Sequence, residues 1–180
     1  RHAADALEGA GDGRWDWDLA SGAVHFSDSW KASLGHAPHE IAHTLEEWQS
    51  RIHPADLPAA LERVDEHLQG LTPAYRSEHR LRCKDGSYRW FLDRGRVLER
   101  DAEGQPLRMM GIHSDTTAQH EAEEDLRASE ATLRSLLASL GEGVVMRGMD
   151  GSVVLANAAA GRVLGLSPDQ VGPFDQADSP

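Results

Sequence analysis

The middle of the chain alternates between apolar and charged residues, as a half-buried β-strand does. Residues 75–83 follow this period of two, and Lys84-Asp85-Gly86 predicts a tight turn after them. A second strand is predicted over residues 87–98, and a turn at 101–104 leads into a third over residues 106–115. The inward positions of the first of these strands are Tyr75, His79, Leu81 and Cys83.

The start of the chain predicts a hairpin followed by a helix. Two short strands over residues 15–19 and 23–26 flank a turn. Ser27 is placed to cap a helix over residues 28–34, because a serine side chain can accept a hydrogen bond from the first helical turn.

Helical signals continue up to Gly70. Brief turns are predicted over residues 38–42 and 44–50, and a longer helix over residues 57–68. Its apolar positions recur at spacings of three and four, so this helix is expected to cover a sheet with one face. The predicted stripe consists of Leu57, Leu61, Val64 and Leu68.

The order of these elements is two strands, several helices and three strands, which predicts an α+β module with a five-stranded antiparallel sheet. All five Trp and both Tyr lie before residue 91. Large aromatic side chains fill cores, so one complete core is expected within residues 14–117.

The pattern then changes to one long helix. Residues 118–140 contain no Gly or Pro. At about 1.5 Å per residue this helix runs roughly 35 Å, which indicates a connector. Residues 1–13 are interpreted as a further helical segment at the N-terminus. Leucines near heptad spacing predict a parallel homodimer through the connector: Leu126, Leu133, Leu137 and Leu140.

The chain also repeats part of itself. Residues 34–41 and 164–171 share Leu, Gly, Pro and a β-branched residue at the same spacing. A second hairpin is predicted before the repeated segment, with Asn157 at the capping position that Ser27 has in the first copy. Residues 141–180 are therefore interpreted as the N-terminal part of a second, similar domain.

Composition narrows the possible partners. The chain has 18 Lys and Arg against 30 Asp and Glu, a formal net charge of -12, which disfavours nucleic acid and anionic membranes. Cys83 is the only cysteine, so the sequence has no internal disulfide and fits a reducing, cytoplasmic compartment. No apolar stretch reaches the length of a membrane span, and no membrane contact is expected.

Several short motifs in a fixed order resemble the PAS family, in particular the subgroup with a Trp-rich first strand and a C-terminal PAC motif. The resemblance implies a sheet order of 2-1-5-4-3, helices over one face and a small pocket between. It also implies a sensory or relay module of a multidomain bacterial protein, a histidine kinase or a cyclic-dinucleotide enzyme, with no catalysis in this fragment. The motifs are Trp15-Asp16-Trp17-Asp18-Leu19, Phe26-Ser27, Leu34-Gly35, Ile52-His53-Pro54-Ala55-Asp56-Leu57, Glu78-His79-Arg80-Leu81, Lys84-Asp85-Gly86, Arg89-Trp90, Gly111 and Asp115-Thr116-Thr117.

Two positions depart from the family pattern. The usual Asp-Ile-Thr ending is Asp115-Thr116-Thr117, which we take as the signal exit. His79 stands where the family commonly has an aromatic residue, so a titratable group is expected in the pocket. The expected pocket residues are Leu68, His79, Leu81, Trp90 and Ile112; the alternative is a filled core without a ligand.

Three other motifs suggest metal or cofactor chemistry. His39-Glu40-Ile41-Ala42-His43 has the spacing of a zinc protease, and His36 lies close enough in sequence to join incidental metal binding, but a solvated helix is the preferred interpretation. His67 is considered as a haem ligand and predicted to be a surface residue instead. Cys83 lacks the sequence context of a flavin-binding light sensor and is expected to be a small buried residue. No metal site is predicted, and the cofactor is left open between a small organic ligand and none.

Three classes of function remain. The first is a sensor whose pocket acts on the connector helix and on a downstream output domain of the same chain. The second is a ligand-free dimerisation scaffold with the same helix. The third and most remote is a zinc metallopeptidase that uses His39, Glu40 and His43.

Overall fold

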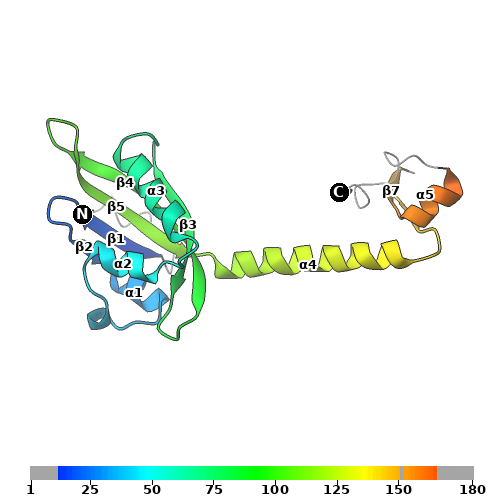
Figure 1. Cartoon of the computed structure of the whole chain (residues 1–180), viewed down its shortest axis with the longest axis horizontal. Helices are drawn as coiled ribbons and strands as arrows, with labels where there is room; N and C mark the ends of the chain where they lie inside the picture. The colour runs from blue at the N-terminus through cyan, green and yellow to red at the C-terminus, as the bar shows by residue number, and fades with distance from the viewer. Residues whose placement is uncertain (1–11, 151, 166–180) are drawn as a thin grey trace. The chain divides into compact units, whose positions relative to one another are not determined.

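The computed structural model describes residues 12–150 and 152–165, and the chain divides into two units between His120 and Glu121 (Figure 1). The first unit contains a five-stranded sheet in the order β2-β1-β5-β4-β3, with every neighbouring pair antiparallel. The predicted α+β class and strand order are confirmed. The strands are β1 (Gly13–Asp18), β2 (Val24–Phe26), β3 (Tyr75–Arg82), β4 (Tyr88–Arg100) and β5 (Pro106–Asp115).

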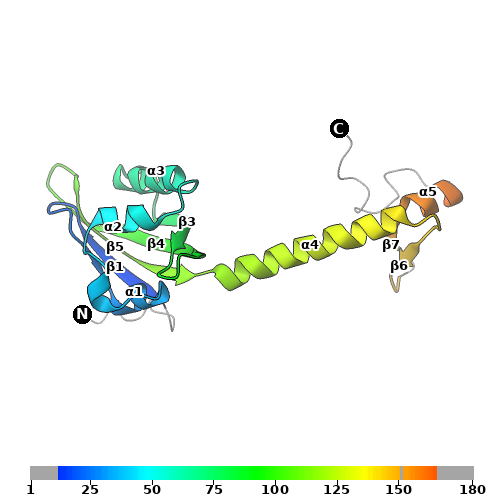
Figure 2. The same ribbon diagram turned by 60° about the horizontal axis from the view of Figure 1, so that its bottom comes forward.

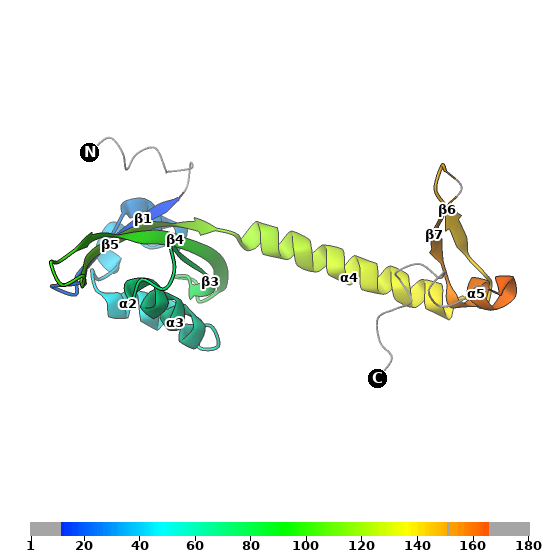
Figure 3. The ribbon, with the colours of Figure 1, turned by 90° about the horizontal axis from the view of Figure 1, so that it is seen from above.

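Short helices connect β2 to β3 and cover one face of the sheet. Figure 3 shows α2 and α3 on the same side of the sheet. Side-chain caps start two of them: the Ser27 hydroxyl accepts from the Trp30 N–H, and the Thr44 hydroxyl accepts from the Glu47 N–H. The helices are α1 (Asp28–Ser33), the 3-10 turn η2 (Pro38–Glu40), α2 (Leu45–Arg51) and α3 (Leu57–Leu68).

The core lies between the helices and the inner face of the sheet. Strand alternation points every second side chain inward, and the largest of these are fully buried. Trp15 lies across two paired glycines, Gly95 of β4 and Gly111 of β5. A Cβ atom at Gly111 would come within 2.3 Å of the Trp15 ring, so this position has to be glycine for the indole to lie flat on the sheet.

Helix α3 packs three of the four predicted stripe residues, Leu57, Val64 and Leu68, against the core, but not Leu61. Leu61 is 37% exposed, whereas Ala60 and His67 are 2% and 4% exposed. The prediction that His67 lies on the surface was therefore wrong. Its Nε2 accepts a hydrogen bond from the Val97 N–H at 3.1 Å, so Nδ1 carries the proton and donates to the Thr72 carbonyl at 3.0 Å. Because both ring nitrogens are hydrogen-bonded, burial of His67 leaves no polar atom unsatisfied, and neither nitrogen is free to bind haem iron.

The second unit contains most of α4 (Thr117–Ser139), which begins in the first unit, and a hairpin followed by a helix (Figure 2). The hairpin strands are β6 (Val145–Arg147) and β7 (Val153–Ala156). The Asn157 side chain accepts from the Ala160 N–H and caps α5 (Ala158–Leu164), as Ser27 caps α1. The hairpin and its cap were predicted. The predicted helix over residues 1–13 falls almost entirely, and the repeat beyond residue 165 entirely, outside the described residues.

Candidate functional site

A small, partly open cavity lies in the first unit, between the inner face of the sheet and the helices. Its volume is about 40 Å³. A single water needs about 10–15 Å³ on such a measure, so the space fits a molecule of three to four non-hydrogen atoms and neither a haem nor a flavin. We call it the chamber. The chamber is lined by Trp15, Trp17, Val24, Phe26, Leu45, Trp48, Val64, Tyr75, Asp93 and Met109.

Asp93 is the one carboxyl group that lines the chamber, and it is only 2% exposed. The Trp15 indole N–H donates to its Oδ1 at 3.1 Å. Burial raises the pKa of Asp93 to about 7, and hydrogen bonds from Trp15 and Trp48 oppose that rise. This carboxyl can therefore change charge near neutral pH.

Two histidines lie beside Asp93 on the inner face of the sheet. His79 Nε2 is 3.3 Å from Asp93 Oδ2, and burial lowers the pKa of His79 to about 4. His113 pairs with Asp93 across β4 and β5, stacks on Trp30 and Phe91, and has its pKa lowered to about 3 by burial. Both imidazoles are therefore neutral inside the core.

None of the five expected pocket residues lines the chamber, and they lie in different parts of the first unit. His79 and Leu81 are fully buried on the inner face, and Leu68 packs against the core, but the chamber is lined by another set. Trp90 and Ile112 lie on the opposite face of the sheet from the chamber, because their neighbours Phe91 and His113 point inward. Of the five, His79 is the residue that contacts the carboxyl group of the chamber, Asp93.

Sequence reasoning missed the residues that do line the chamber. The signal for two of them was the alternation Trp15-Asp16-Trp17, which places both indoles on one face of β1. Asp93 carried no such signal, since a charged residue in a strand is ordinarily assigned to solvent.

The predicted exit motif joins β5 to α4. Asp115 Oδ1 accepts from the Thr117 N–H at 2.9 Å, and the Thr117 hydroxyl accepts from the Trp90 N–H at 3.0 Å. Thr116, which replaces the family's apolar residue, donates through its hydroxyl to Glu78 Oε1 at 3.1 Å. At this position a hydrogen bond to the Glu78 side chain of β3 thus takes the place of apolar packing.

The first turn of α4 is held to the sheet by one further residue. His120 Nε2 lies 3.0 Å from Glu78 Oε1, and its ring stacks on Trp90 with centroids 4.2 Å apart. Glu78 therefore contacts both Thr116 and His120. We call Glu78, Trp90, Thr116 and His120 the junction clamp.

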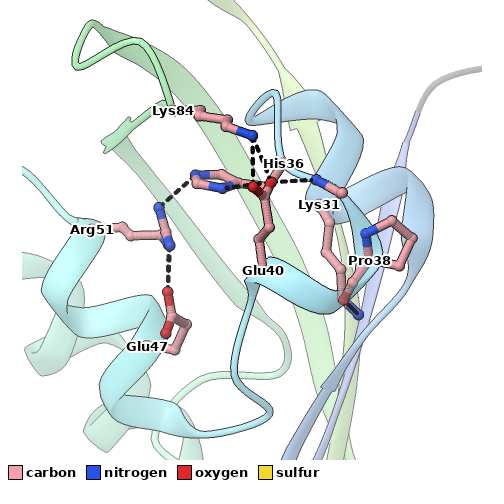
Figure 4. Close-up of polar contacts among 8 residues, drawn as sticks. Lys31, His36, Pro38, Glu40, Glu47, Arg51 and Lys84 are labelled. Carbon is pink, nitrogen blue, oxygen red and sulfur yellow. Dashed lines mark hydrogen bonds and ion pairs between the residues drawn. The ribbon is translucent and has the colours of Figure 1, made fainter.

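The His39-Glu40-x-x-His43 motif does not form one helical face. Glu40 ends a 3-10 turn, accepts from Lys84 Nζ at 2.6 Å and caps the Ala37 N–H at 2.8 Å (Figure 4). The Lys84 hydrogen bonds lower the pKa of Glu40 to about 2, and a carboxylate held this way is not placed to take a proton from water. His43 instead stacks on His25 with centroids 4.9 Å apart. The solvated helix that we expected here is thus a tethered turn.

His36 is held by hydrogen bonds and charges of the same cluster. Arg51 Nη1 donates to His36 Nε2 at 3.0 Å, and burial together with Arg51 lowers the pKa of His36 (Figure 4). Within residues 12–150 and 152–165 no three His, Cys, Asp or Glu side chains are grouped as metal ligands are. Cys83 is buried, and burial raises the pKa of its thiol.

The connector helix exposes its leucines. Leu126, Leu133 and Leu140 are 60%, 48% and 45% exposed, and Leu137 is half-buried. No helix in the described part of the chain is both long and apolar enough to traverse a lipid bilayer. The leucines of α4 thus form an exposed apolar surface on an otherwise polar helix.

Comparison with known proteins identifies the family. The family model described as "PAS fold" matches residues 23–113. The Sensor protein FixL of Bradyrhizobium diazoefficiens is 29% identical over 164 residues, which are 89% of this chain and 31% of FixL. The probable diguanylate cyclase DgcE of Escherichia coli is 28% identical over 165 residues, which are 92% of this chain and 15% of DgcE. The chain thus spans less than a third of these curated relatives.

A solved structure supports the assignment. The crystal structure of a sensory box histidine kinase/response regulator from Burkholderia thailandensis aligns with a TM-score of 0.64 and 33% identity, over 75% of this chain and 99% of that one. The chain belongs to the PAS family and is a sensory module of the kind carried by multidomain signalling proteins.

Proposed function

We propose that this chain is the sensing and relay part of a cytoplasmic bacterial signalling protein, in which the state of the chamber controls α4. The output, a histidine kinase or a cyclic-dinucleotide enzyme, lies elsewhere in the full protein, and this part catalyses no reaction itself. The names of the relatives support this assignment.

The observation that carries the proposal is the continuity of β5 with α4. Met109 of β5 lines the chamber, His113 lies in the core, and Asp115 caps the helix that starts at Thr117. A change in the chamber therefore acts on the same strand that leads into the connector. A coupling of about 1–3 kcal/mol is enough to change a two-state equilibrium about 5- to 150-fold.

We further propose that α4 pairs with a second copy of itself in a parallel homodimer. The exposed leucines at positions 126, 133 and 140 support this, because a heptad seam left in water is unfavourable. The expected effect of Leu133→Ser with Leu137→Ser is a loss of dimer in sedimentation velocity. Ala131→Ser with Ala138→Ser, on another face of the same helix, is the matched control and should leave the dimer intact.

The relay is tested by filling the chamber. Val64→Leu adds one methylene to the chamber wall and imitates occupancy, so it should change the dimer dissociation constant about fivefold or more. Val153→Leu makes the same change on β7, where the side chain is 40% exposed, and should leave that constant unchanged. Equal dimer dissociation constants for Val64→Leu, Val153→Leu and the wild type would favour the alternative function, a ligand-free dimerisation scaffold. The small chamber volume also supports that alternative.

A further inference from the structure

The lining of the chamber selects by charge. Five of its residues are aromatic and four are aliphatic or thioether, which leaves Asp93 as the only carboxylic acid. No Lys, Arg or His of the described residues lines it. An anion in this space would face a carboxyl group in a low-dielectric setting without a counter-charge, and the energy cost excludes it.

The same lining favours a cation. Indole and phenol rings attract an ammonium group through their negative faces. Trp15, Trp48 and Tyr75 all line the chamber around Asp93. A carboxylate can accept several hydrogen bonds, and a bond from an ammonium N–H would be charge-assisted and about twice as strong as a neutral one.

Two residues of the chamber lining each carry a buried polar atom without a hydrogen-bond partner. The two atoms are the Trp17 Nε1–H, which can only donate, and the Tyr75 hydroxyl, whose side chain is 3% exposed. A buried polar atom without a partner is unfavourable, because it has lost its hydrogen bonds to water, so a ligand that satisfied both atoms would bind more tightly. Trp17 requires a ligand oxygen, and Tyr75 can accept from a ligand N–H.

One ligand chemistry meets all of these requirements. We propose that the chamber binds a small organic ammonium ion that carries one hydroxyl group, with the amino alcohols as the simplest class. The ammonium group pairs with Asp93 and donates to Tyr75, and the hydroxyl oxygen accepts from Trp17. This inference rests on the proposed function, since it names the ligand of the same chamber, and the volume of about 40 Å³ limits that ligand to about four non-hydrogen atoms.

The test uses a pair of probes that differ only in charge. Ethanolamine hydrochloride and ethylene glycol have the same four-atom skeleton, and one carries an ammonium group where the other carries a hydroxyl. Titrated into the 180-residue chain at pH 8 and constant ionic strength, ethanolammonium should bind saturably in calorimetry, about tenfold or more tightly than ethylene glycol. Intrinsic Trp fluorescence gives a second readout, because three of the lining residues are Trp.

Variants assign the contacts. Asp93→Asn should abolish the preference for ethanolammonium over ethylene glycol. Trp17→Phe should weaken ethanolammonium binding while the aromatic wall remains. Tyr88→Phe changes an aromatic residue of β4 that is 40% exposed and lies outside the chamber lining; it is the control and should change neither affinity.

Each remaining outcome decides the question. Equal affinity for the two probes in the wild type would show that Asp93 does not select charge and would overturn the inference. The absence of saturable binding by ethanolammonium would overturn it as well. The proposed relay does not depend on this result, because it is tested separately by the dimer dissociation constant of Val64→Leu. If Asp93→Asn does not fold, the comparison of probes in the wild type and in Tyr75→Phe decides alone.

Discussion

Three titratable side chains are buried next to one another on the inner face of the sheet. His79, Asp93 and His113 are 0%, 2% and 1% exposed and come from three adjacent strands. Tyr75 and Ser77 of β3 face the same group, and the carboxylates of Asp56 and Glu78 act on His79 by raising its pKa. Burial outweighs these effects and keeps both imidazoles neutral.

These shifts predict how stability depends on pH. Below pH 6.5 the unfolded chain protonates both histidines and the native state does not, so they lower stability as the pH falls. Asp93 acts in the opposite sense, because its pKa is raised to about 7 in the folded chain. Its contribution to the stability of the folded state is present at low pH and is lost as the pH rises through 7. The two core histidines outnumber the one carboxyl, and His36 acts in the same direction as these histidines. The free energy of unfolding should therefore fall as the pH decreases from 6.5 to 5, with a slope that approaches about 1.4 kcal/mol per unit near pH 5.

Urea denaturation at several pH values measures this slope. His113→Gln removes one of the two core histidines and should make the free energy of unfolding clearly less dependent on pH in this window. His39→Gln, in an exposed turn, is the control and should keep the wild-type slope. Identical slopes for the two variants would show that His113 is not the group responsible.

At the scale of elements, β5 and α4 are joined by side chains as well as by the backbone. Glu78 of β3 accepts from the Thr116 hydroxyl and lies 3.0 Å from His120, which stacks on Trp90 of β4. Two strands therefore hold the first turn of the connector. The junction clamp makes the start of α4 part of the first unit.

Removing Glu78 should loosen that first turn. Glu78→Ala deletes both contacts, which at this exposed site are together worth about 0.7–1.4 kcal/mol. Amides of residues 117–122 should therefore exchange hydrogen about three- to tenfold faster. Arg76→Ala, on the same outer face of β3, is the control. Unchanged exchange in Glu78→Ala would mean that the backbone alone sets the position of the helix start.

The whole molecule combines two units of very different core size. The first unit buries large side chains such as Trp30, Leu34 and Phe91, whereas the hairpin unit has a cluster of Ala156 and Ala160 with Val145 packed against it. A two-stranded hairpin with so little apolar cover is marginally stable in water. The two units are therefore expected to open independently.

Hydrogen exchange on the 180-residue chain tests this difference. Amides in β3, β4 and β5 should exchange on the order of 10³-fold or more slowly than those in β6 and β7, because only the former require opening of the large core. Similar protection in both sheets would contradict the independence of the units.

The sequence predicted the elements and their order well, because strand and helix periods, turn residues and caps act locally. It failed on which face some strands present: Trp90, Phe91 and Leu92 are consecutive apolar residues, so their alternation defines no phase. The phase is fixed by pairing with β5, where His113 points inward beside Asp93.

The chamber itself was harder to predict. Asp93 and His67 are polar, so hydrophobic periodicity assigned neither to the core. Each is buried only because a partner far away in sequence satisfies it, Trp15 for Asp93 and Val97 for His67. Such pairs become visible only when the chain is folded.

The glycine pair beneath Trp15 has a consequence for how far a signal has to travel. Gly111 lies under the indole, and Asp115, which caps α4, is four residues further along β5, about 13 Å at the rise of a strand. Because β5 is the central strand, paired with β1 on one edge and β4 on the other, it cannot bend locally without breaking ladders on both sides. A tilt of a single indole ring would thus be transmitted as a displacement of the entire strand end, with little of it absorbed on the way.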